Sequence, residues 1–318
     1  MRTETIYESR SLYRDNFQVK AYVFGTGKKS LCVVGNMRGD EYQQIYTCSQ
    51  LIQWLKKAER EDILTPGHEI MVIPSANTYS MNIKKRFWPI DNTDINRMFP
   101  GYDQGETTQR VAAGIFGRIN CFQYGVQLAS NYMAGEFVPY INVMTTGHED
   151  VELAKKFGLP YVVLRNSRPY DTTTLNYNWQ IWDTKAYSLY TTTTERINHD
   201  SALRGVKAIF SFMAAVGLIR YENREEAVSR VIDDHEMISV RSPEAGLFEP
   251  VVKVEQEVKA GSLLAKILNP LDGETLAHIY APADGIIFFM DSGPLTYGHT
   301  AVIKMIPLKK ENSPCPHE

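Results

Sequence analysis

The chain has 318 residues, of which 43% are hydrophobic and 22% charged, so it is long enough to bury a substantial core and to divide into two domains. Its formal net charge is −3 and its lysines and arginines are dispersed, which excludes the basic surface of a nucleic-acid partner. Segment 1–10 lacks the apolar region of a signal peptide, and no apolar run is long enough to cross a bilayer. We therefore predict a cytoplasmic protein without a membrane partner.

The first two thirds of the chain alternate between short apolar strands and amphipathic helices, which predicts an α/β domain with a largely parallel sheet. We expect the first two strands to form a hairpin around the glycine-rich turn 25–29. The long irregular stretch 75–105 has a length typical of functional loops. Strands are expected at 17–24, 31–35, 70–74, 124–128, 140–144, 161–164 and 187–190, and helices from residue 40 and near 107–122, 149–157 and 201–218.

The composition changes after Arg220. A charged stretch, 222–236, is followed by short β segments separated by glycine and proline, so we place an α/β domain at 1–221 and a linker with a small all-β domain at 222–318. The sequence segments 258–261 and 281–286 resemble those of the barrel-sandwich hybrid fold of biotinyl and lipoyl domains. Lys304 falls in the expected last strand and not at a hairpin tip, which favours a structural module over a carrier.

The four cysteines have none of the paired spacing that marks a zinc knuckle or a disulfide framework. We expect reduced, buried thiols at Cys32, Cys48, Cys121 and Cys315.

Polar motifs follow two of the expected strands. Gly35–Glu41 follows a strand and opens a helix, which places its side chains at the carboxyl edge of the sheet, where α/β proteins hold ligands. Further along come 73–77 and the string Asp-Ile-Asn-Arg-Met-Phe-Pro-Gly at 94–101. Together these motifs resemble the succinylglutamate desuccinylase and aspartoacylase family, and the resemblance covers nearly the whole chain. It implies a zinc-carboxypeptidase-like fold, with a mixed, mostly parallel sheet flanked by helices.

The resemblance also implies a zinc-dependent hydrolase of N-acyl amino acids, but most of the implied site positions are substituted. Glu41 keeps the family's carboxylate ligand, whereas Arg38 stands at the first histidine ligand, and a permanent guanidinium cation repels a metal. In 125–129, Gln127 and Ala129 replace the aspartate and the histidine that is the third ligand. Tyr190 stands at the general-base position, and a phenol with a reference pKa of about 10 is a poor base at neutral pH. We expect that zinc is not bound in the family's usual way.

The positions that hold substrate are better matched. Asn96 and Arg97 match the pair that holds the substrate carboxylate in the family, and arginine suits bidentate carboxylate recognition. The resemblance matches Arg86 to the arginine that polarises the scissile carbonyl in the family, although its spacing to Asp94 is one residue longer than usual. The alternative for Arg97 is an internal salt bridge with Asp94 or Glu41.

Among the seven histidines, only His148 in the polar turn 147–150 follows a strand of the α/β domain at a place where it is a candidate replacement ligand. The alternative is an ordinary helix start in which Glu149 or Asp150 is the capping residue.

Two hypotheses follow. In the first, the protein is a catalytically degenerate relative in which Arg38 takes the volume and charge of the zinc, pairs with Glu41, and joins Arg97 in binding an N-acyl amino acid or a peptide carboxylate. In the second, it is an active amidohydrolase with a rearranged metal site or a metal-free mechanism, with Tyr190 as the acid and arginines stabilising an oxyanion. A third alternative is a scaffold whose β module forms the contacts of a homo-oligomer.

Overall fold

The computed structural model describes residues 1–11, 15–220 and 228–308. These residues form two compact units: the first comprises 1–132 and 139–232, and the second comprises 133–138 together with the chain from residue 233. The expected domain boundary at 221/222 lies outside the described residues. No helix in the described part is both long and apolar enough to span a membrane.

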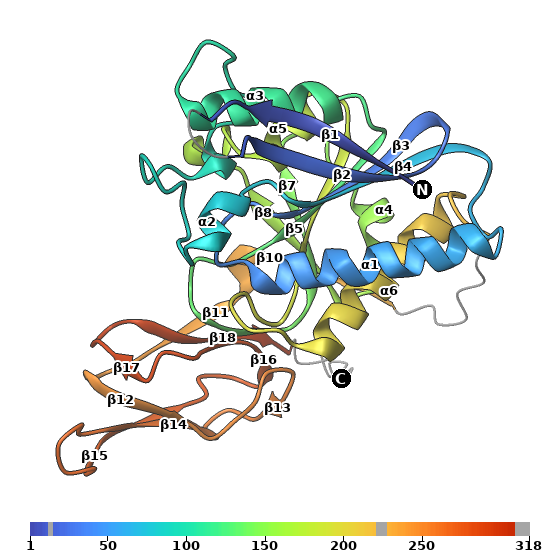
Figure 1. The fold of residues 1–318 in the computed structure, drawn as a ribbon. Coiled ribbons are helices and arrows are strands. Elements are labelled where there is room, and N and C mark those ends of the chain that lie inside the picture. The colour runs from blue at the N-terminus through green and yellow to red at the C-terminus, as the bar shows by residue number, and fades with distance from the viewer. Residues whose placement is uncertain (12–14, 221–227, 309–318) are drawn as a thin grey trace, which may run out of the picture. The chain divides into compact units, whose positions relative to one another are not determined.

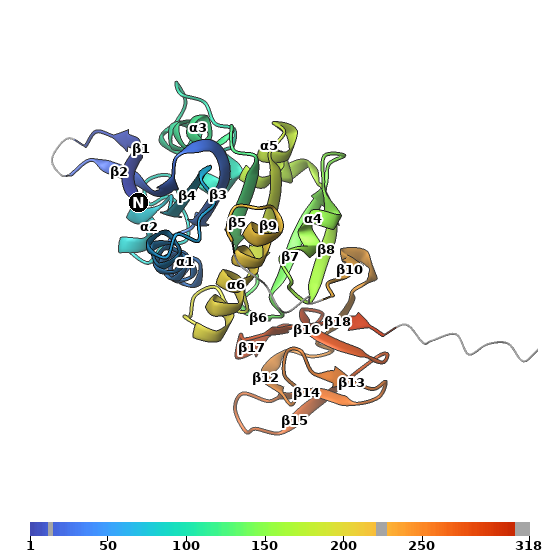
Figure 2. The same ribbon diagram turned by 90° about the vertical axis from the view of Figure 1, so that its right-hand side faces the viewer.

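The strands of the first unit form one mixed sheet, in the order β1-β2-β4-β3-β5-β9-β7-β8-β10 (Figure 2). Strands β3, β4, β5 and β9 are mutually parallel, and so are β7 and β8, but β7 runs antiparallel to β9. The strand bounds are β1 (Arg2–Ser9), β2 (Phe17–Gly25), β3 (Gly27–Asn36), β4 (Gly67–Ser75), β5 (Tyr124–Ala129), β7 (Tyr140–Thr145), β8 (Tyr161–Asn166), β9 (Lys185–Tyr190) and β10 (Arg230–Asp233).

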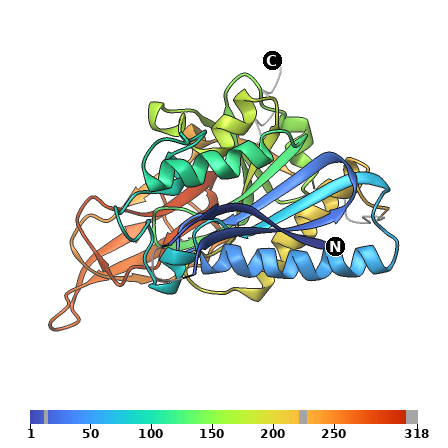
Figure 3. The ribbon, with the colours of Figure 1, turned by 45° about the horizontal axis from the view of Figure 1, so that its top comes forward.

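Helices cover both faces of this sheet, which confirms the predicted α/β class (Figures 1 and 3). The long blue α1 and the green α3 lie on opposite sides of the strands in Figure 3. On the α1 side, Cys48, Ile52 and Leu55 recur at three and four residues along one helix face and pack with α6 and the sheet. The helix bounds are α1 (Tyr42–Arg60), α2 (Thr78–Asn82), α3 (Thr107–Ile119), α4 (Val151–Lys155), α5 (Leu175–Ile181) and α6 (His199–Ala215), with 3-10 turns η1 (Ile95–Arg97), η2 (Pro169–Asp171) and η3 (Asp234–Glu236).

The expected hairpin between the first two predicted strands is wrong. Strand β4 lies between β2 and β3, pairing antiparallel with β2 and parallel with β3. The buried run Ile70–Ile73 explains the insertion, because a strand that is apolar on both faces gains most when it has a neighbour on each side.

The second unit is all β and contains two antiparallel sheets. Its core includes Leu264, Ile287 and Val302, and Lys304 lies within β18 as expected. Strand β6, which comes from the middle of the chain, pairs with β16. One sheet has the order β11-β18-β16-β13 with β6 beside β16, and the other has the order β15-β14-β12-β17; the bounds are β6 (Gly135–Phe137), β11 (Ile238–Arg241), β12 (Gly246–Pro250), β13 (Glu257–Val258), β14 (Leu263–Leu268), β15 (Thr275–Tyr280), β16 (Gly285–Asp291), β17 (Leu295–Thr296) and β18 (Ala301–Pro307).

The cysteines are less uniform than expected. Cys32 and Cys48 are completely buried reduced thiols, as predicted, and burial raises the pKa of each thiol. Cys121 is exposed, which contradicts the expectation, because it follows the end of α3 at the surface. Cys315 lies outside the described residues.

This difference predicts the pattern of thiol modification. Iodoacetamide at neutral pH should alkylate Cys121 in the folded protein and leave Cys32 and Cys48 unmodified, because the thiolate is the reactive species and burial suppresses it. Peptide mass spectrometry distinguishes these cysteines, with the urea-unfolded chain as the fully labelled control. Equal labelling of Cys32 and Cys121 before unfolding would contradict the structure.

Candidate functional site

The turn after β3 is shaped by the carboxylate of Glu41. Glu41 is 1% exposed, and its Oε2 accepts hydrogen bonds from the backbone N–H groups of Met37 (2.8 Å) and Arg38 (3.0 Å). Gly39 is needed here because a Cβ at this position would lie 2.2 Å from the carbonyl oxygen of Lys85. The turn therefore places residues 38 and 41 side by side at the carboxyl edge of the sheet.

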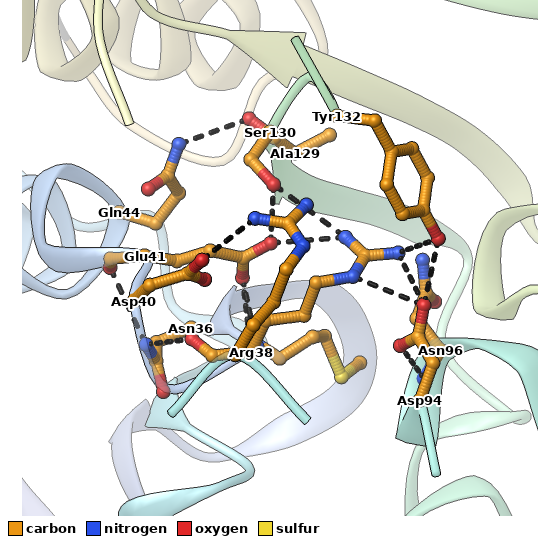
Figure 4. Close-up of polar contacts among 12 residues, drawn as sticks. Asn36, Arg38, Asp40, Glu41, Gln44, Asp94, Asn96, Ala129, Ser130 and Tyr132 are labelled. Atoms are coloured by element: carbon orange, nitrogen blue, oxygen red, sulfur yellow. Dashed lines mark hydrogen bonds and ion pairs between the residues drawn. The ribbon is translucent and has the colours of Figure 1, made fainter. Parts of the chain in front are cut away.

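The guanidinium of Arg38 fills the centre of this turn (Figure 4). Its Nη1 lies 3.0 Å from Glu41 Oε1, and its Nε and Nη2 lie 3.1 and 2.9 Å from Asp94 Oδ2. Nη2 also donates to the hydroxyl of Tyr132 at 3.1 Å, and Nη1 is 3.5 Å from Ser130 Oγ. Burial lowers the pKa of Arg38, but Glu41 and Asp94 raise it by more, so the group stays a cation. All five guanidinium N–H donors thus have partners.

This arrangement contains the predicted pair of Arg38 with Glu41, but it leaves Arg38 no free donor for a ligand. The side chain is only 4% exposed. The expected contact between Arg38 and an anionic ligand therefore requires the network to open. As described, Arg38 connects Glu41 to Asp94.

The residues present do not fit a zinc ion. Oε1 of Glu41 accepts from Arg38 and from the Ser130 hydroxyl, so both of its oxygens are already hydrogen-bonded. Ala129, at the position that the family resemblance implies for the third ligand, has no side-chain atom that could bind a metal. Within the described segments, no group of three or more His, Cys, Asp or Glu side chains is arranged to hold a metal. A zinc centre would need donors that this turn lacks.

The topology does not support His148 as a replacement ligand. His148 follows the carboxyl end of β7, and β7 runs antiparallel to β9, whose carboxyl end lies beside that of β5. His148 therefore lies at the opposite edge of the sheet from Glu41. Its turn is an ordinary helix start, because Asp150 Oδ1 accepts from the N–H of Leu153.

Tyr190 ends β9 in direct register with Ala129 on β5, so the implied base and ligand positions are neighbours. Its ring stacks on that of Tyr140, with centroids 4.7 Å apart and planes at 5°. Burial raises the pKa of Tyr190, although Arg165 and Arg38 act in the opposite direction. Tyr190 is thus a neutral phenol at pH 7, which is a hydrogen-bond donor and not a base.

Both Arg97, expected to hold the substrate carboxylate, and Arg86, expected to polarise the scissile carbonyl, have partners within the protein. Arg97 pairs with Asp171 at 3.3 Å and donates to the Tyr170 carbonyl at 2.7 Å, so its internal partner is neither Asp94 nor Glu41. Arg86 pairs with Asp40 at 2.9 Å, while its buried Nε and Nη2 have no hydrogen-bond partner among the described residues.

One of the two polar side-chain atoms of Asn96 is hydrogen-bonded within the protein. Its Oδ1 accepts from the backbone N–H of Leu175 at 3.2 Å, where α5 begins. Its Nδ2 makes no hydrogen bond within the described part of the chain, so a donor remains for a ligand.

Tyr132 joins these groups and was not found from the sequence. Its ring centroid lies 4.9 Å from the guanidinium carbons of Arg38 and Arg86 and 5.8 Å from that of Arg97, and its hydroxyl donates to Asp94 at 2.8 Å. Contacts of this kind stabilise cations through the ring face. Its place just after a strand end, like that of Ser130, was the available signal.

These features define an α/β fold with a cluster of charged and polar side chains at the carboxyl edge of its sheet. A model of the succinylglutamate desuccinylase/aspartoacylase catalytic domain matches residues 27–215, and the chain belongs to this family. The N-alpha-acetyl-L-2,4-diaminobutyric acid deacetylase of Halomonas elongata is 25% identical over 83% of this chain and 77% of its own length.

Solved structures share the fold. A succinylglutamate desuccinylase from Silicibacter sp. TM1040 has a TM-score of 0.76 at 19% identity, covering 93% of this chain and 91% of its own. The ectoine utilization protein EutE (DoeB) of Ruegeria pomeroyi has a TM-score of 0.73 at 19% identity, covering 92% and 90%. At this identity, these likenesses establish the fold alone.

Proposed function

We propose that this protein is a binding member of its family, which recognises an anionic N-acyl amino acid or peptide carboxylate without the zinc chemistry of its relatives. The observation that carries the proposal is the position of Arg38. Its guanidinium pairs with the retained ligand carboxylate, Glu41, and uses every donor within the protein. A fixed organic cation there supplies positive charge but has no open coordination position for water.

The choice of ligand class is supported by the cations around this turn. Arg97 is 25% exposed and Arg86 21% exposed, and both keep N–H groups that the described protein does not use. Guanidinium groups recognise carboxylates through paired hydrogen bonds. The names of the relatives describe acylated amino acids, succinylglutamate and N-acetyl-diaminobutyric acid, which carry such a carboxylate.

A metal-free amidohydrolase is the second candidate, and Tyr190 is the observation that favours it. The phenol keeps its proton at neutral pH and lies near cationic Arg38 and Arg165, so it is suited to donate a proton or hydrogen bond to an oxyanion. Against this candidate, the neutral phenol at the implied general-base position is a poor base for activating a water molecule.

Metal content and turnover together test the proposal. Protein purified without chelator should carry far less than one equivalent of zinc and should release no amino acid from N-acetyl-L-aspartate or N-succinyl-L-glutamate during prolonged incubation. Stoichiometric zinc, or turnover that grows with protein concentration, would overturn it.

Calorimetric titration with the same two compounds tests the binding role. Arg97→Gln should weaken binding about 10- to 150-fold, because a hydrogen bond to a charged group contributes about 1.5–3 kcal/mol. Arg118→Gln is the matched control, since it removes a surface cation that pairs with Glu4. Unchanged affinity in Arg97→Gln would refute the role of Arg97 in binding the ligand carboxylate.

A further inference from the structure

A buried carboxylate, Asp171, lies between two arginines that come from separate parts of the chain. Asp171 Oδ1 is 3.3 Å from Nη1 of Arg97, and its Oδ2 is 3.1 Å from Nη1 of Arg165. The side chain of Asp171 is 2% exposed, and its Oδ2 also accepts from the N–H of Arg168 at 3.0 Å. Asp171 therefore holds both guanidinium groups in fixed positions.

The charges of this trio do not cancel, because two guanidinium cations share one carboxylate. Arg97 and Arg165 remain 25% and 27% exposed, so both reach solvent. Across the described residues, Nε and Nη2 of each arginine make no hydrogen bond with the protein. The trio thus presents one uncompensated positive charge and two sets of free N–H donors.

Tyr190 faces the same side of the sheet as Arg165. Val162 and Leu164 of β8 pack in the core beneath α1 and α6, as do Tyr187 and Leu189 of β9. Because side chains alternate along a strand, Arg165 and Tyr190 both point to the other face, where α5 lies. The Tyr190 hydroxyl has no hydrogen-bond partner among the described residues. Tyr190 is level with Tyr161, four residues before Arg165 on β8, and the charge of Arg165 still acts on the pKa of the Tyr190 phenol.

We infer that Arg165 and Arg97, fixed by Asp171, form a carboxylate subsite in which each guanidinium donates to one ligand carboxylate group and Tyr190 supplies a further donor. The inference deepens the proposed function and rests on it, and it adds Arg165, which no motif assigned. A planar, singly charged carboxylate matches the planar arrangement of guanidinium N–H donors and the net charge of +1 on Arg97, Arg165 and Asp171. A phosphate dianion would keep one negative charge uncompensated.

Calorimetry on matched variants tests the subsite. Arg165→Gln and Arg97→Gln should each weaken binding of N-acetyl-L-aspartate about 10- to 150-fold. The fold-loss of affinity in the double variant should be smaller than the product of the fold-losses in the two single variants, because both side chains bind one carboxylate group. Arg168→Gln is the control, since Arg168 lies on the same loop and its guanidinium donates to the Tyr170 hydroxyl. Arg165→Lys keeps the positive charge but removes the paired N–H donors of the guanidinium, and should also bind N-acetyl-L-aspartate more weakly.

The outcomes separate the subsite from the proposed function. Equal losses of affinity in Arg165→Gln and Arg168→Gln would show that only the net charge matters, and would overturn the subsite alone. Wild-type affinity in both Arg165→Lys and Arg165→Gln would do the same. Binding of succinate with no binding of any N-acyl amino acid would keep the subsite and overturn the proposed function. Tighter binding of inorganic phosphate than of succinate would overturn the carboxylate assignment. A wild-type chain that binds none of these anions would overturn both.

Discussion

Replacing Arg38 with alanine is expected to lower the free energy of unfolding by about 3–5 kcal/mol, which is the usual cost of removing one partner from a buried ion pair. Glu41 and Asp94, 1% and 9% exposed at their side chains, would keep their negative charges without the cation between them. Denaturation by urea, followed by circular dichroism, measures the change.

Two comparisons show whether the buried network is responsible. Arg118→Ala removes an arginine whose side chain is 52% exposed, so it should cost less than about 1 kcal/mol. Arg38→Lys keeps the charge but has fewer, differently directed donors, and its cost should fall between the two. An Arg38→Ala protein as stable as Arg118→Ala would show that the network contributes little.

Placing histidine at residues 38 and 129, where the family resemblance implies histidine ligands, should create a zinc site. The double variant Arg38→His, Ala129→His removes the cation from the turn and adds two nitrogen donors beside Glu41 (Figure 4). With Glu41 as the third ligand, it should bind about one zinc per chain, because three nitrogen or oxygen ligands with an open position are the usual catalytic zinc set. Plasma emission spectrometry after dialysis gives the metal content.

Each single variant and the triple variant with Glu41→Gln serve as controls and should bind substantially less zinc. Zinc uptake by the wild-type chain equal to that of the double variant would contradict the proposal that these two residues decide metal binding. Failure of a folded double variant to take up zinc would show that residues 38, 41 and 129 do not converge as described.

The sequence predicted the α/β class and most of its elements, because apolar periodicity reports directly which face of an element is buried. It also predicted a mostly parallel sheet, but not which strands are reversed. Alternation of strands and helices favoured a parallel sheet, whereas β7 and β8 run against β9. That reversal moves His148 to the far edge of the sheet, and a single sequence contains no local pattern that reports it.

The site was predictable to the extent that its residues lie in short motifs. Arg38 and Glu41 are three residues apart in one turn, so their pairing followed from spacing. Tyr132 and Arg165 contact residues 38 and 171, respectively, through side chains from other strands or loops. Such contacts depend on how elements pack in space, and spacing along the chain does not determine them.

Strand β6 has a consequence for how this protein can be divided. The chain passes between its two units at 132–133, 138–139 and 232–233, and Tyr132 is the last residue before the first crossing. No single peptide cut separates the units, and a chain shortened at residue 232 would leave Gly135–Phe137 without its partner strand β16. Tyr132, which contacts three arginines of the site, is therefore joined by one peptide bond to a segment that folds with the C-terminal module. A truncation that removes the module leaves this segment unpaired directly after Tyr132.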